Sequence, residues 1–151
     1  MAKYIDIKVV EAVPMTAGAA VKKGYTAFKA LEDKNYKGYE TTYSGGHKIW
    51  RPYDMFEKNN VCVQGLYDKF VVPDGKKVEP FIETIIEEYN RMNVKYGELM
   101  EFINDEYKLS KLDIKDQNDL IYQSNAMAAY ISVLRKRFKR LINKYPFTDV
   151  E

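Results

Sequence analysis

Two series of apolar residues with alternating steps of three and four dominate the second half of the chain. Such steps keep side chains on one face of an α-helix, so each series predicts a long helix. Pro80 suits the first turn of one helix, and Asp113 is the expected N-cap of the other. The two series are Ile82, Ile85, Tyr89, Met92, Tyr96, Leu99 and Ile103, and then Leu120, Ser124, Met127, Ile131, Leu134, Phe138, Leu141 and Tyr145.

Folding the chain back at residues 109–112 aligns the two series as an antiparallel hairpin. In this register Met92 faces Ile131 and Ile85 faces Phe138. One flank of the hairpin is then an apolar strip, interrupted only by two polar residues, Asn93 and Arg135. Because two helices cannot cover this strip, we expect the N-terminal sheet or another copy of the protein to lie on it, with a dimer as the minimal homo-oligomer. The strip comprises Ile86, Met100, Ile121, Ala128 and Ile142.

The first half of the chain carries the signals of short strands and helices. Alternation over Tyr4–Val10 predicts a half-buried strand that Pro14 ends. Thr16 is the expected N-cap of a helical turn over residues 17–23, and Pro52 opens a helix that ends at Asn59 or Asn60. Paired glycines at 45 and 46 predict a tight turn between strands at 38–43 and 47–51.

Together these patterns predict an α+β fold with a linker where prolines, a glycine and lysines cluster. We expect a small antiparallel β-rich unit with short helices over residues 1–72, the linker at 73–80 and a long helical hairpin over 81–151.

Composition excludes several classes of function. Twenty-four basic residues against 22 acidic ones give a net charge of +2, which is too balanced for a protein that coats a nucleic acid polymer. No apolar run resembles a signal peptide or approaches the roughly 20 residues of a membrane span, so we expect no membrane partner. The single cysteine, Cys62, lies between two valines and predicts a buried thiol in a reducing cytoplasm.

Catalytic and metal motifs are missing from the sequence. One histidine, His47, and one cysteine cannot form a Cys/His zinc cluster, and no glycine-rich phosphate loop occurs. We therefore expect a protein that is not an enzyme, takes no cofactor and acts by binding. The plentiful carboxylates leave hydrolysis by a pair of acids as the alternative.

The group Trp50, Arg51 and Tyr53 is the main candidate for ligand binding, because aromatic rings stack on bases and guanidinium groups grip phosphates. Asn93 and Arg135 join it as the polar groups of the apolar strip, where a ligand would satisfy them. In the competing interpretation Trp50 packs the sheet, and Arg135 pairs with an acid on a neighbouring subunit.

The first 58 residues resemble the opening segment of small accessory proteins from bacteriophages and prophages. The resemblance rests on Val10-Glu11-Ala12, Pro14-Met15-Thr16 and Gly38-Tyr39, followed by Tyr43 to Gly46, Trp50-Arg51-Pro52 and Phe56-Glu57. It implies a phage origin, and it implies little about activity.

The hairpin more loosely resembles small phage helical proteins, through Leu112, Asp116-Gln117, Met127, Tyr130 and Leu134. It is also similar to the helical core of phage nucleotide sponges that disarm the CBASS and Thoeris immune systems. That resemblance implies an oligomeric anti-defence protein in the host cytoplasm that sequesters a cyclic nucleotide or an ADP-ribose derivative. The alternative function is an adaptor whose hairpin binds a host or phage protein.

Overall fold

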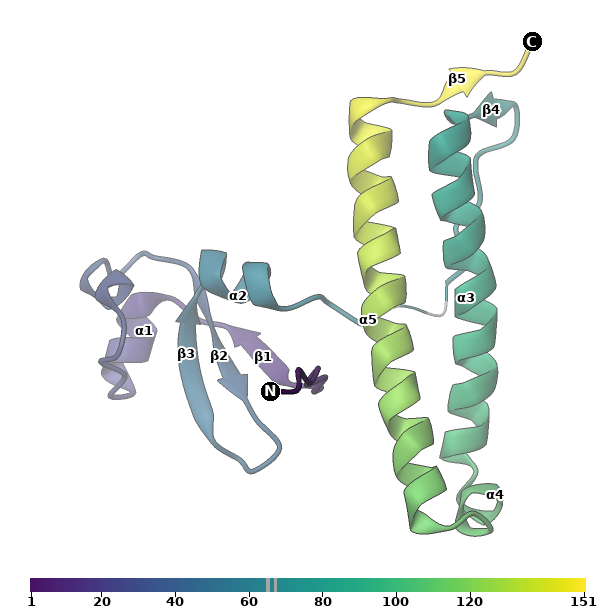
Figure 1. Cartoon of the computed structure of the whole chain (residues 1–151). Coiled ribbons are helices and arrows are strands. Elements are labelled where there is room, and N and C mark those ends of the chain that lie inside the picture. The colour runs from purple at the N-terminus through teal and green to yellow at the C-terminus, as the bar shows by residue number, and fades with distance from the viewer. Residues whose placement is uncertain (65, 67) are drawn as a thin grey trace. The chain divides into compact units, whose positions relative to one another are not determined.

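The computed structural model describes residues 1–64, 66 and 68–151, and it has an α+β fold (Figure 1). The chain forms two compact units, Met1–Val61 and Cys62–Glu151. The boundary thus precedes residues 73–80, where the sequence predicts a linker. The physical reason is that Leu66, Phe70 and Val72, which the sequence assigns to the first unit, pack in the core of the second unit.

The first unit contains a three-stranded antiparallel sheet with the strand order β1-β2-β3. Its elements are β1 (Glu11–Pro14), α1 (Ala17–Lys22), a short 3₁₀-helix η1 (Lys29–Glu32), β2 (Gly38–Thr42), β3 (Lys48–Pro52) and α2 (Tyr53–Asn59).

Several predicted elements of the first unit are confirmed. The side chain of Thr16 accepts a hydrogen bond from the backbone of Ala19 at 3.3 Å and caps α1. Strands β2 and β3 pair across the glycine turn, in which Gly46 has a φ of 81°. Glycine adopts this left-handed conformation without the strain that a Cβ atom brings. A small core of Ala17, Ala20, Leu31 and Trp50 lies beneath the sheet.

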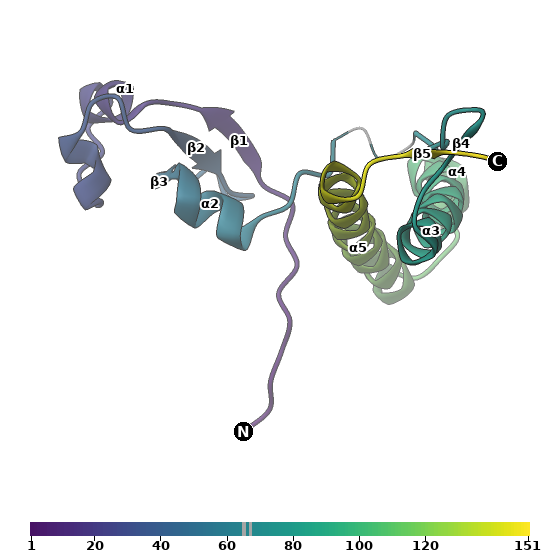
Figure 2. The same cartoon turned by 90° about the horizontal axis from the view of Figure 1, so that it is seen from above.

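The predicted strand over Tyr4–Val10 is wrong. The first strand is Glu11–Pro14 instead, and residues 1–10 lie outside every strand. Strand β2 sets this limit, because its last residue, Thr42, pairs with Glu11 and the turn begins immediately afterwards. Earlier residues therefore have no position on β2 with which to pair. Figure 2 shows them as an extended trace that leads away from the sheet.

The second unit is the predicted antiparallel hairpin. Its elements are β4 (Lys76–Lys77), α3 (Pro80–Asn104), α4 (Glu106–Ser110), α5 (Ile114–Lys144) and β5 (Thr148–Asp149). Pro80 occupies the first turn of α3, and the side chain of Asp113 accepts a hydrogen bond from the backbone of Asp116 at 2.9 Å. Both helix starts therefore follow the sequence signals.

The core of the hairpin consists of the residues that the two apolar series identify. Ile82, Ile131 and Phe138 are completely buried, and the rings of Tyr89 and Phe138 meet edge to face with centroids 5.0 Å apart. The turn expected at 109–112 overlaps the end of a short additional helix, α4. The side chain of Asp105 caps this helix by accepting a hydrogen bond from the backbone N–H of Lys108 at 3.1 Å.

Residues 62–72, here called the strap, cover part of the hairpin within the second unit. The side-chain amide of Asn90 accepts from the backbone N–H of Phe70 and donates to its carbonyl, both at 2.9 Å. The hydroxyl of Tyr89 donates to the carbonyl of Asp68 at 3.0 Å. Leu66 is completely buried in the hairpin core. Positions 65 and 67 lie outside the described residues.

The apolar strip on the hairpin flank is thus partly covered by its own chain. Ile86 and Ala128 are only 4% and 3% exposed, and both belong to the core cluster that includes Leu66. Ile121 stays 42% exposed. Neither the N-terminal sheet nor a second copy is needed to bury Ile86 and Ala128.

Cys62 lies at the start of the strap, and its predicted burial is wrong because its side chain is exposed. Its backbone, by contrast, is held by the hairpin through a hydrogen bond from Arg135. Within the described residues, the helices lack an apolar stretch long enough to span a membrane.

We predict that Ile131→Asp unfolds the second unit, because Ile131 is completely buried and an unpaired charge there costs about 3–5 kcal/mol. Far-UV circular dichroism should show a large loss of thermal stability. Val133→Asp is the matched control on the same helix, since Val133 is 39% exposed and its substitution should leave the melting temperature almost unchanged. Equal melting temperatures for the two variants would contradict the proposed packing of Ile131 in the core of the hairpin.

Candidate functional site

Trp50 packs the sheet of the first unit. Its side chain is 1% exposed, and its indole N–H donates to the carbonyl of Met15 at 2.8 Å. The ring of Phe28 meets it edge-on at 6.2 Å. Both faces of the indole are therefore occupied by the core, as in the packing interpretation of the sequence, and no ligand reaches them in this conformation.

Arg51 is the neighbour of Trp50 on β3 and points to the opposite face of the sheet. Its guanidinium donates to the hydroxyl of Tyr43 at 3.2 and 3.3 Å and lies 3.8 Å from the sulfur of Met55. These contacts orient a half-buried cation beside the start of α2.

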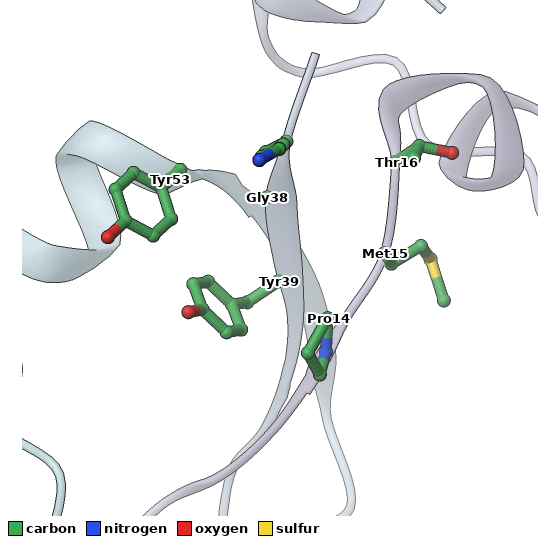
Figure 3. A pocket seen from close by; sticks show the side chains of 7 residues that line it. Pro14, Met15, Thr16, Gly38, Tyr39 and Tyr53 are labelled. Carbon is green, nitrogen blue, oxygen red and sulfur yellow. The ribbon is translucent and has the colours of Figure 1, made fainter. Parts of the chain in front are cut away.

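A recess of about 310 Å³ lies beside Tyr53, the first residue of α2. Tyr53 is 46% exposed, and its ring stacks on that of Tyr39 at 6.0 Å with an interplanar angle of 23°. Figure 3 shows both rings on one side of β2, with Pro14 at the end of β1 and Met15 and Thr16 on the segment that leads to α1. The remaining lining residues are Lys37 and Gly38.

The recess is held in shape by the sheet and by its own contacts. The backbone N–H of Met15 donates to the carbonyl of Gly38, and that of Tyr53 donates to the carbonyl of Lys37, both at 2.9 Å. Tyr39 packs against Phe56 at 4.4 Å and donates its hydroxyl to Glu57 at 3.1 Å. A Cβ atom at Gly38 would lie 2.3 Å from the Trp50 ring, so only glycine allows this close approach.

The recess can accept one flat ring. Its volume is near the lower limit of the 300–1,000 Å³ that small-molecule sites span. Tyr53 offers a half-exposed aromatic face, and the exposed ammonium group of Lys37 supplies a positive charge for an anionic substituent. An aromatic heterocycle that bears a negative group fits this combination.

Asn93 lies on α3 of the second unit and is 6% exposed. Among the residues that the structure describes, neither its amide nitrogen nor its amide oxygen has a hydrogen-bond partner. A polar group that is buried without a partner costs about 1–3 kcal/mol. The interruption of the apolar strip at this position is therefore an energetic cost that packing does not explain.

Arg135 fixes the strap to α5. Its guanidinium donates to the carbonyls of Cys62 and Gln64, each at 3.0 Å. A charge-assisted bond of this kind is stronger than a neutral one, and it satisfies two carbonyls outside any helix or strand.

The five candidate residues therefore fall into two groups. Trp50, Arg51 and Tyr53 belong to the first unit, and only Tyr53 lines the recess. Asn93 and Arg135 belong to the second unit. Sequence reasoning missed Pro14, Met15, Lys37 and Tyr39 as partners of Tyr53. The register that pairs Pro14 with Tyr39 brings them together, and that register follows from the sheet order rather than from local sequence.

Glu40 is a buried carboxylate on β2, 7% exposed, on the sheet face that Trp50 also occupies. It accepts a hydrogen bond from the hydroxyl of Tyr25 at 2.8 Å and forms an ion pair with Lys23 at 3.2 Å. The hydroxyl of Tyr25, and then the ammonium groups of Lys23 and Lys48, lower the pKa of Glu40 against the opposing effect of burial. Burial and the bond to Glu40 raise the pKa of Tyr25.

Comparison with known proteins concerns the hairpin. Residues 79–140 match the model of a protein family described as Sequestin. The matched segment includes all of α3 and α4 and most of α5. The name of this family suggests a sequestering binding protein. No curated protein and no solved structure matches the chain.

We predict that acid weakens the first unit through Glu40. Because its pKa in the folded protein lies below the ordinary value of 4.5, its contribution is complete above that pH and is lost as the pH falls through the lowered pKa. The fluorescence of Trp50, the one tryptophan, should report unfolding of this unit at progressively lower temperature in that window.

Glu40→Gln should lower the unfolding temperature at neutral pH and flatten its dependence on acid. Glu32→Gln, at an exposed position, is the control and should behave like the parent. An unchanged acid response in Glu40→Gln would show that other carboxylates govern it.

Proposed function

We propose that this protein binds a nucleotide-type immune signal and sequesters it without cleaving it. The observation that carries the proposal is the match of residues 79–140 to the Sequestin family model, since the family name describes this mode of action. The resemblance of the hairpin to phage nucleotide sponges supplies the ligand class, a cyclic nucleotide or an ADP-ribose derivative. The place of action is the cytoplasm of a host cell infected by a phage.

Two features of the structure support a ligand of this class. The recess at Tyr53 suits a flat ring with an anionic substituent, because it combines an aromatic face with Lys37. The amide of Asn93 presents one donor group and one acceptor, which match the hydrogen-bonding edge of a base or the hydroxyls of a ribose. Because Asn93 is buried, a ligand that reaches it must displace covering side chains, and the bonds it forms offset that cost.

The proposed action needs no bond cleavage, so the ligand should leave the protein unchanged.

A protein-binding adaptor is the second candidate, and exposed apolar side chains on the hairpin favour it. Val94, Ile121 and Val133 are 61%, 42% and 39% exposed. An adaptor of this kind would retain a protein in a pull-down and would ignore nucleotides.

One experiment distinguishes sequestration of a nucleotide from the adaptor function. The full chain is incubated with a mixture of cyclic dinucleotides, cyclic trinucleotides and cyclic ADP-ribose isomers, freed of unbound compound, and then denatured by heat. Mass spectrometry of the supernatant should recover one of the compounds intact. Recovery of a hydrolysed product would indicate an enzyme, and recovery of no compound, with a protein retained from lysate, would favour the adaptor.

We predict that Asn93→Leu stabilises the free protein and weakens ligand binding. Leucine has nearly the shape of asparagine and removes a buried amide that lacks partners, so the melting temperature should rise by a few degrees. Isothermal titration with the recovered compound should show reduced affinity. Asn125→Leu, at a partly buried position of α5, is the control. A lower melting temperature for Asn93→Leu would mean that the amide has a partner in the folded protein.

We also predict that Tyr53→Ala weakens binding roughly 5- to 150-fold, the equivalent of about 1–3 kcal/mol for a lost base stack. Tyr53→Phe should bind like the parent, because the ring stays. Tyr107→Ala, which removes a tyrosine that is 70% exposed in the second unit, is the control. Parental affinity in Tyr53→Ala would place the ligand outside the recess.

A further inference from the structure

Residues 4–10 form an extended segment in which charged and apolar side chains alternate. The ammonium group of Lys8 lies 3.0 Å from the carboxylate of Asp6, so these two side chains share one side of the chain. Ile5, Ile7 and Val9 fall on the opposite side because successive side chains of an extended backbone alternate. Tyr4 is 90% exposed and Val9 is 57% exposed.

This segment continues directly into β1, an edge strand of the three-stranded sheet. Exposed edges of this kind are templates for a further strand. A seven-residue stretch with strand periodicity and exposed apolar side chains therefore fits a partner that is itself an extended strand.

Two copies of residues 4–10 are complementary to each other when they are aligned as antiparallel strands. With Ile7 opposite Ile7, each Asp6 faces a Lys8 and each Lys8 faces an Asp6. In the same register Ile5 faces Val9, and Tyr4 faces Val10. Cross-strand pairs of opposite charge, of β-branched residues and of an aromatic with a β-branched residue are the ones that stabilise antiparallel sheets.

We propose that residues 4–10 of two copies of this protein pair as antiparallel strands about a two-fold axis at Ile7. The two ion pairs between Asp6 and Lys8, one within each chain, are then exchanged for two ion pairs between the chains. One self-complementary patch serves both partners, as two-fold symmetry requires. The ribbon joins the three-stranded sheets of the two copies through their β1 strands.

The charges of Asp6 and Lys8 favour a second copy of this protein as the partner strand. Any other extended peptide would have to supply a lysine opposite Asp6 and an acid opposite Lys8 at the same spacing, whereas a second copy always does. This interface is separate from the hairpin, and the inference does not rest on the proposed ligand.

Cysteine cross-linking tests the register directly in the full chain. All variants carry Cys62→Ser, so that the introduced thiol is the only one. Ile7→Cys places two thiols opposite each other, where the Cα atoms of an antiparallel pair lie about 4.5–5.5 Å apart and a disulfide closes without strain. Tyr4→Cys is the matched control, because six residues of offset at about 3.4 Å each place its two thiols roughly 20 Å apart.

Under mild oxidation at tens of micromolar protein, Ile7→Cys should form the covalent dimer at least about tenfold faster than Tyr4→Cys. Thiols held within a bound pair experience effective concentrations in the millimolar range. Equal rates for the two variants, whether fast or slow, would overturn the proposal. Denaturant should abolish the difference.

Charge exchange then tests the pairing of Asp6 with Lys8 in the Ile7→Cys background. Asp6→Lys and Lys8→Asp each place like charges opposite each other, so each variant alone should lose the rapid cross-linking. A mixture of the two restores opposite charges across the ribbon, and so does the double variant Asp6→Lys/Lys8→Asp, so both should regain it. Rapid cross-linking in the single variants, or none in the mixture and the double variant, would overturn this register.

Discussion

The side-chain amide of Asn90 makes the pair of hydrogen bonds to Phe70 that the second unit depends on. By satisfying both backbone groups of a residue outside any helix or strand, it does what a neighbouring strand would otherwise do. Earlier in the strap, Tyr89 and Arg135 donate to the carbonyls of Asp68 and Cys62. These bonds satisfy backbone groups of the strap while Leu66, Phe70 and Val72 pack on the hairpin core.

The sequence predicts the regular parts of this architecture well, because their signals are local. Helix periodicity, the caps at Thr16 and Asp113, and the glycine turn at Gly46 each act over a few residues. The apolar residues of the strap do not recur with the spacing of a helix or a strand, and the strap is held by polar side chains that are distant in sequence. No local pattern therefore predicts its position. The strand expected at Tyr4–Val10 failed for a related reason: its alternation is genuine, but whether a strand pairs depends on the length of β2.

The candidate site shows the same division. Tyr53 was identified from its residue type, and it lines a recess; Trp50 was identified on the same grounds and is buried, because alternation on β3 turns the two neighbouring residues Trp50 and Arg51 to opposite faces. Pro14 and Lys37 gave no signal of their own. Asn93 was identified as a polar interruption in an apolar strip, and its buried amide has no hydrogen-bond partner in the part of the chain that the structure describes.

The small bridge between β4 and β5 has a consequence for how the second unit is assembled. Lys76 pairs with Asp149, Lys77 pairs with Thr148, and the backbone of Val150 donates to Gly75 at 3.0 Å, so the chain before α3 is tied to the chain after α5. Contacts this distant in sequence form late, after the intervening chain has been made. On the ribosome the two helices can zip together as α5 emerges, while the loop that encloses them stays open until residue 150 has left the exit tunnel.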